Sequence, residues 1–309
     1  MNFVKKFGRI LLPMITPFKE DYSVDYKMAR EISKYLLERN FCDSLIISGT
    51  TGEFHSLTFE ERVKLFEEIK DEIGNKIPLI AGTGTIFTKE AIELTKAAEK
   101  IGYDAAMVVL PYYCHPTQDG IYYHFKEIAK NTSIPIIIYN IPLFVNMSIT
   151  PETAAKLSEI ENIVAIKDEA GLNPLQTSEF IKKSRNRLTV YSGDDVMVLQ
   201  VLSQGGVGVV SGASHVVGDM IRDMITSFLN GKVERSIKLF QILYDVFKSF
   251  FGISTEQINP TPGVKLAFEI ESGLPVSRTR PPLMTYTRED REFIKRNLEK
   301  ARAAYQELE

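Results

Sequence analysis

The sequence predicts an α/β fold: an eight-stranded parallel (β/α)8 TIM barrel with a C-terminal helical appendage. Three observations predict it. Short apolar runs recur eight times, helix-like segments separate them, and strand signals stop after Gly231. The runs are continuous rather than alternating in hydropathy, as expected for parallel strands that are covered on both faces. Eight strand–helix units in succession fit a closed barrel, so we expect domains at 1–231 and 232–309.

The expected strands follow one another through the barrel domain. They cover 10–15, 44–48, 77–81, 105–110, 134–139, 163–167, 188–192 and 206–210. A doubly wound open sheet is the competing architecture, but it usually carries a glycine-rich turn after its first strand. Here that turn is Thr16-Pro17-Phe18, without glycine, which favours the barrel.

The helices are expected from amphipathic spacing and end signals. Phe59–Ile73 and Thr88–Ile101 carry apolar residues at helical intervals, and Gly102 follows the second as a helix end. Pro151 fits the first turn of another helix. In the appendage, 233–251 and 288–308 are expected as helices, with a broken helical stretch at 258–274.

Composition excludes several functional classes. The 309 residues are 44% hydrophobic with a net charge of −3, which argues against nucleic-acid or anionic-membrane partners. Cys42 and Cys114 form no metal or redox motif and favour a reducing compartment. The four histidines are scattered, so no metal site is expected. With neither a signal peptide nor a membrane-spanning run, we expect a cytoplasmic protein.

Lys167 carries the most chemical information. It closes the apolar run of the sixth expected strand. An ammonium beside an apolar wall is poorly solvated, which favours the neutral amine, and a neutral amine attacks carbonyl carbons. A strand-end lysine that reaches for solvent is the commoner case, so this residue alone does not establish a Schiff base.

Polar residues at the other strand ends change that balance, because the active site of an α/β barrel lies at the carboxyl ends of its strands. Thr50, Tyr113 and Tyr139 follow or end three of these strands and can relay protons during attack on a ketone. The turn that contains Gly49 and Thr51 offers N–H groups and hydroxyls for a carboxylate. A small 2-oxo acid such as pyruvate satisfies both requirements.

Six motifs identify a family resemblance. They are Gly49-Thr50-Thr51-Gly52-Glu53, Ala81-Gly82-Thr83-Gly84, Pro111-Tyr112-Tyr113, Tyr139-Asn140-Ile141-Pro142, Ile166-Lys167-Asp168 and Ser192-Gly193-Asp194-Asp195. In order and spacing, the chain resembles the dihydrodipicolinate synthase / N-acetylneuraminate lyase superfamily of pyruvate-dependent class I aldolases, nearly from end to end.

The resemblance implies roles for individual residues. Lys167 matches the Schiff-base lysine, Tyr139 the proton donor or acceptor, and Thr50 and Tyr113 the rest of the relay. The second tyrosine of this relay comes from a neighbouring subunit, which implies a homotetramer built from two tight dimers. Thr51 matches the residue that holds the pyruvate carboxylate. The remaining residues expected around the substrate are Gly49, Gly193 and Val210. The resemblance implies no metal or organic cofactor.

Phe144 departs from the family pattern. Dihydrodipicolinate synthases carry an arginine here that binds the carboxylate of the aldehyde substrate, and a phenyl ring cannot donate such a hydrogen-bond pair. This disfavours aspartate semialdehyde and makes the chain resemble archaeal 2-keto-3-deoxygluconate aldolases. Asp168 and Glu169 are expected either to bind sugar hydroxyls or to be solvated charges on the rim.

The sequence therefore predicts a lyase that forms a pyruvate enamine on Lys167. The first hypothesis is reversible cleavage of a 2-keto-3-deoxy sugar acid to pyruvate and an aldehyde. The alternative within this chemistry is condensation of pyruvate with aspartate semialdehyde, the dihydrodipicolinate synthase reaction. A non-catalytic 2-oxo-acid sensor is the alternative of another class. The intact set of relay residues argues against the sensor, since a sensor needs no proton relay.

Overall fold

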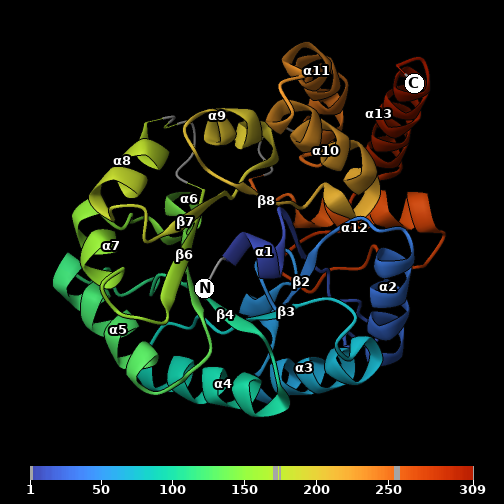
Figure 1. Cartoon of the computed structure of the whole chain (residues 1–309). Coiled ribbons are helices and arrows are strands. Elements are labelled where there is room, and N and C mark those ends of the chain that lie inside the picture. Colours follow the sequence, from blue (N-terminus) through green and yellow to red (C-terminus); the bar gives the residue numbers. More distant parts are fainter. Residues whose placement is uncertain (1–2, 170–172, 174, 254–257, 309) are drawn as a thin grey trace.

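Eight parallel strands close into a barrel in the computed structural model, which describes residues 3–169, 173, 175–253 and 258–308 (Figure 1). Each strand pairs with the next along the chain, and the last pairs with the first. The strands are β1 Ile10–Pro13, β2 Ser44–Ile47, β3 Leu79–Gly82, β4 Ala105–Val109, β5 Ile136–Asn140, β6 Ile163–Asp168, β7 Thr189–Ser192 and β8 Gly208–Val210. The predicted fold class is confirmed, with strand ends displaced by one or a few residues.

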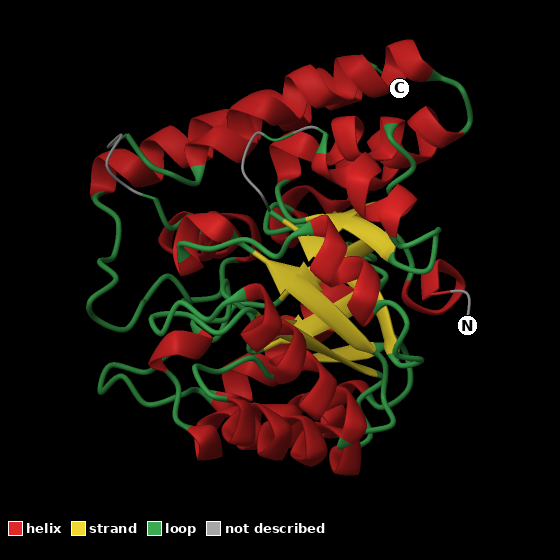
Figure 2. Ribbon diagram, turned by 90° about the vertical axis from the view of Figure 1, so that its left-hand side faces the viewer, coloured by secondary structure: helices red, strands yellow, loops and turns green. Residues whose placement is uncertain are grey.

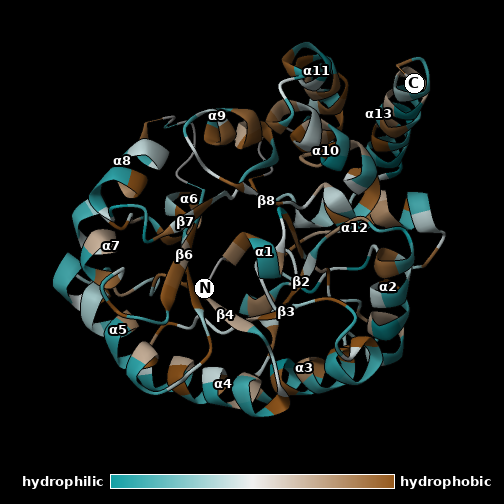
Figure 3. Ribbon diagram, viewed as in Figure 1, coloured by the Kyte–Doolittle hydropathy of each residue, from teal (hydrophilic) through white to brown (hydrophobic). Residues whose placement is uncertain are grey.

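Helices surround the barrel, with their polar faces outward (Figures 2 and 3). The outer helices are α2 Tyr26–Glu38, α3 Phe59–Ile73, α4 Thr88–Ile101, α5 Gln118–Lys130, α7 Pro151–Leu157, α8 Gln176–Lys183, α9 Val198–Ser203 and α10 Ser214–Leu229. Short helical turns follow β2, β5 and β7, namely η1 Phe54–Ser56, α6 Pro142–Val145 and η2 Asp195–Met197. The predicted bounds of α3 and α4 are correct.

A short helix that the sequence did not predict lies at the amino-terminal end of the barrel. It is α1, Phe3–Phe7, and it appears at the centre of the barrel in Figure 1. Phe3 and Phe7 are buried and stack with ring centroids 4.2 Å apart, and Phe3 meets the edge of Tyr191. Five residues are too few for a recognisable period, which is why this helix was missed.

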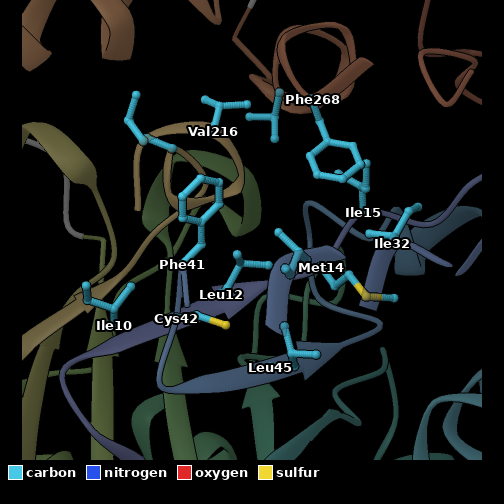
Figure 4. Packing of buried hydrophobic residues seen from close by; sticks show 14 of the residues in the cluster. Ile10, Leu12, Met14, Ile15, Ile32, Phe41, Cys42, Leu45, Val216 and Phe268 are labelled. Carbon is cyan, nitrogen blue, oxygen red and sulfur yellow. The ribbon is translucent and has the colours of Figure 1, made fainter. Parts of the chain in front are cut away.

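Among the described residues, three helices follow the barrel: α11 Val233–Ser249, α12 Thr261–Ser272 and α13 Arg288–Gln306. Phe268 of α12 points toward Ile15 and Ile32 and belongs to the same hydrophobic cluster as barrel residues such as Leu12 (Figure 4). The boundary at 231/232 stays a prediction, because this cluster continues across it. Among the described helices, none is long and apolar enough to cross a membrane.

A fully buried ion pair fixes α12 to the loop after β2. Lys265 Nζ lies 2.6 Å from Glu53 Oε1, and both side chains are 0% exposed. Glu53 also accepts a hydrogen bond from the backbone N–H of Arg280 at 3.0 Å, and Lys265 donates to the carbonyl of Arg278. Burial lowers the pKa of Lys265 to about 8, because desolvation outweighs the attraction of Glu53.

Replacing Lys265 by methionine removes one partner of this pair and leaves the Glu53 charge buried. We expect K265M to lower the free energy of unfolding by about 3–5 kcal/mol. The matched control is K89M, which breaks the exposed Lys89–Glu93 contact at 3.8 Å and should change stability by less than about 0.5 kcal/mol. Urea unfolding of both variants measures the difference, and equal losses would contradict a special role for the buried pair.

Candidate active site

A cavity of about 490 Å³ opens at the carboxyl ends of the strands. The barrel and its loops form one part of its wall, and α11, α12 and described residues between them, such as Phe251 and Ile258, form another. Most of the site residues predicted from the sequence line it. They are Thr50, Thr51, Tyr139, Phe144, Lys167, Glu169, Gly193 and Val210.

Lys167 is buried near the end of β6, with its side chain 6% exposed. It is in register with Tyr139 of β5 on one side and Tyr191 of β7 on the other. Its Nζ lies 3.9 Å from the centre of the Tyr139 ring and 3.0 Å from Oε2 of Glu169. The predicted burial is correct, but the predicted environment was incomplete, since it contains a carboxylate as well as apolar groups.

Tyr139 connects two sides of the cavity. Its hydroxyl donates a hydrogen bond to Glu169 Oε2 at 3.0 Å and lies 3.4 Å from Oγ1 of Thr50. Burial, and secondarily the charge of Glu169, raise the pKa of Tyr139 well above its usual value. The phenol is therefore protonated at neutral pH, and it forms a continuous polar path from Thr50 to Lys167.

Glu169 follows β6, and its position depends on two neighbouring strands. Its backbone N–H donates to the carbonyl of Asn140 at 2.9 Å. A Cβ atom at Gly193 would lie 2.5 Å from Glu169 Cβ and 3.0 Å from Lys167 Cε, so no other residue fits at 193 without displacing them. Burial raises the pKa of Glu169; Lys167 opposes this shift and the nearby charge of Asp194 adds to it.

The turn that carries Thr50 and Thr51 rests on a buried arginine. Arg62 of α3 donates to Oγ of Ser48 at 2.9 Å and to the carbonyl of Gly82 at 2.6 Å. Burial lowers the pKa of Arg62 to about 10, where it still carries its charge at neutral pH. Arg62 thereby joins the ends of β2 and β3 beneath the cavity and fixes the turn.

Three predicted site residues do not line this cavity. The carboxylate of Asp168 accepts from Asn140 Nδ2 at 2.8 Å and from Gln176 Nε2 at 3.4 Å, and burial raises its pKa to about 6. These partners hold Asp168 away from the cavity lining, and its contact with substrate stays a prediction. Gly49 instead lines a small hollow beside Arg62, and Tyr113 is 88% exposed. The role of Tyr113 in a neighbouring subunit stays a prediction.

The sequence reasoning missed the outer wall of the cavity. Phe240, Tyr244, Phe247 and Phe251 line it, and their spacing of four, three and four residues was a readable sign of one helical face. Lys248 lies beside them, and Lys167 and Lys248 are the only lysines or arginines among the described residues that line the cavity.

The site can supply a nucleophilic amine, a phenol and a carboxylate to one bound molecule. No cluster of three or more His, Cys, Asp or Glu side chains suited to a metal ion occurs in the described ranges. The phenol of Tyr139 and the carboxylate of Glu169 beside Lys167 point to amine chemistry on a carbonyl, with protons carried by oxygen acids.

Comparisons with known proteins agree with this arrangement. The model of the dihydrodipicolinate synthetase family matches residues 6–301. The 4-hydroxy-tetrahydrodipicolinate synthase of Desulforudis audaxviator is 42% identical over 289 residues, covering 94% of this chain and 96% of that protein. The Bacillus subtilis protein of the same name is 42% identical over 286 residues, covering 92% and 96%.

Solved structures give the same result. The crystal structure of a dihydrodipicolinate synthase from Bacillus anthracis matches with a TM-score of 0.89 and 40% identity, covering 95% of this chain and 98% of that one. The prediction of an enzyme with pyruvate-dependent class I aldolase chemistry is confirmed at the level of the family. The chain belongs to the dihydrodipicolinate synthetase family.

Proposed function

We propose that this enzyme forms a Schiff base between Lys167 and pyruvate and joins the resulting enamine to aspartate semialdehyde, as in 4-hydroxy-tetrahydrodipicolinate synthesis. The observation that carries the first half is the position of Lys167 Nζ, buried in the cavity and 3.9 Å from the centre of the Tyr139 ring. Attack on the ketone carbon needs a proton for the carbonyl oxygen, and Tyr139 with Thr50 supplies one. Thr51 lines the same cavity for the pyruvate carboxylate.

The second substrate follows from the relatives. Proteins 42% identical over almost the whole chain are named 4-hydroxy-tetrahydrodipicolinate synthase, which favours our alternative over the sugar-acid hypothesis. Aspartate semialdehyde carries a carboxylate, and position 144 offers it no positive charge. Lys248 on α11 lines the outer cavity and is the lysine that remains for this carboxylate once Lys167 is bound to pyruvate.

Cleavage of a 2-keto-3-deoxy sugar acid is the second candidate, because Phe144 lines the cavity where the family resemblance expects arginine. A neutral, hydroxyl-bearing aldehyde needs no cation there. Glu169 and Asp194 also line the cavity and offer acceptors for its hydroxyls.

The homotetramer and the cytoplasmic location expected from the sequence are part of this proposal. The exposure of Tyr113 supports a role at a subunit contact, since an 88% exposed tyrosine at the barrel rim leaves most of its ring for a partner.

The Schiff base can be tested by reduction with borohydride in the presence of pyruvate. We expect intact-mass spectrometry to show a covalent adduct on the wild type and none on K167A, because only this lysine holds the imine. K238A, which removes an exposed lysine of α11 outside the cavity, is the matched control and should be labelled like the wild type. An unlabelled wild type would refute the proposed chemistry.

The second substrate can be tested by comparing two rates. The enzyme should consume aspartate semialdehyde with pyruvate faster than it releases pyruvate from 2-keto-3-deoxygluconate. The reverse ranking would favour the second candidate and the expectation from Phe144.

The role of Lys248 predicts a specific kinetic change. K248M should raise the KM for aspartate semialdehyde at least about tenfold, because a hydrogen bond between charged groups contributes about 1.5–3 kcal/mol. The KM for pyruvate should stay the same, and K238M should change neither value. An unchanged KM for the aldehyde in K248M would remove Lys248 from the substrate site.

A further inference from the structure

We propose that Glu169 is a further catalytic residue, which accepts the proton of the Lys167 ammonium and then holds the C3 proton of bound pyruvate until the new carbon–carbon bond has formed. This inference rests on the proposed Schiff-base chemistry. It goes beyond the sequence-based expectation, which gave Glu169 either a contact with sugar hydroxyls or a solvated position on the rim.

The geometry places a single carboxylate oxygen between both reacting groups. Glu169 Oε2 lies 3.0 Å from Lys167 Nζ and accepts a hydrogen bond from Tyr139 Oη, also at 3.0 Å. Proton transfer in catalysis needs heavy atoms about 2.6–3.2 Å apart, so both contacts are within range. The hydrogen bond from the backbone N–H of Glu169 to the Asn140 carbonyl fixes the backbone of Glu169, and Gly193 leaves room for its side chain.

The surroundings make this carboxylate a better base than an exposed one. Its burial and the charge of Asp194 favour the protonated form, while Lys167 opposes it. Several titratable or charged groups face Glu169. Lys167 and Asp168 lie on β6, Tyr139 on β5, and Asp194 and Asp195 after β7. Lys248 on α11 acts indirectly, because its charge attracts that of Asp194. Two of the neighbouring carboxylates lie after β7 and have their own pKa values raised by burial, Asp195 to about 7.

The proton balance closes within these groups. Glu169 takes a proton from the Lys167 ammonium, and the amine forms the C–N bond while Tyr139 protonates the carbonyl oxygen. The protonated Glu169 restores Tyr139, and a second proton passes from nitrogen to the hydroxyl as water leaves. In sum, ketone and ammonium give iminium and water, with both residues returned to their starting states.

The second half of the reaction uses the same carboxylate. Loss of a C3 proton to Glu169 converts the iminium to the neutral enamine. Attack of C3 on the aldehyde carbon forms the carbon–carbon bond and leaves an alkoxide, which receives the stored proton through Tyr139. The path from Thr50 through Tyr139 and Glu169 to Lys167 lies within one chain.

Exchange of the pyruvate methyl protons in D2O, followed by NMR, tests this role without any second substrate. We expect E169Q to lower the exchange rate about 100-fold, since a positioned acid–base group contributes about 10²–10⁴-fold. The matched control is E161Q, the same change at an exposed glutamate before β6, which should exchange like the wild type. E169D, which keeps a carboxylate on a shorter side chain, should recover part of the rate.

The pH profile separates catalysis from structural support. Because the carboxylate is the base, wild-type exchange should fall as pH drops through the raised pKa of Glu169, and E169Q should lose this acid limb. Borohydride trapping of E169Q by pyruvate should become slower but still reach completion, because Lys167 remains although its proton acceptor is lost. If E169Q exchanges within twofold of the wild type, or keeps the same acid limb, the inference is overturned while the Schiff base stands. A wild type that is not trapped overturns the proposed function and this inference with it.

Discussion

The buried pair of Glu53 and Lys265 is the interaction on which the architecture of the cavity depends. Two opposite charges that are hidden from solvent are stable only when they form an ion pair with each other. The loop after β2 and α12 therefore cannot separate without a large loss of free energy. Glu53 ends the turn that carries Thr50 and Thr51, and Lys265 lies on α12. The pair therefore sets where the C-terminal helices lie relative to the catalytic turn, and the cavity is the space that remains between them.

Charge distribution decides how the centre of the site works. One ammonium, that of Lys167, lies against Glu169 and near Asp194, and the pKa values of both carboxyls are raised because the surrounding protein desolvates them. A fixed salt bridge would only hold the lysine protonated, which opposes nucleophilic attack. A carboxylate that also accepts from Tyr139 can give and take the proton, so the same contact both orients the amine and allows it to react.

Much of the fold could be predicted from the sequence, because buried parallel strands leave continuous apolar runs and amphipathic helices leave a period. The gathering of the predicted site residues at one end of the barrel followed from the rule that the carboxyl ends of its parallel strands lie together. The position of Asp168 outside the cavity lining could also have been predicted. Side chains alternate along a strand, so Lys167 and Glu169 share one face and Asp168 takes the other, where Asn140 binds it. Contacts that depend on tertiary packing, such as the α11 wall, could not be placed without the fold.

The two halves of the cavity differ in how far family membership constrains them. The half that we propose for pyruvate is built from residues at strand ends, such as Lys167 and Tyr139, whose positions follow from barrel register. The half that we propose for the aldehyde is built from Phe144 on a rim turn and from α11, including Lys248, where a single substitution alters charge without disturbing the barrel. Similarity over the whole chain therefore argues strongly for the chemistry of the first half. In the proposed function, selectivity for the aldehyde depends on a few side chains of the outer wall, where Phe144 carries no charge and Lys248 on α11 supplies a positive one.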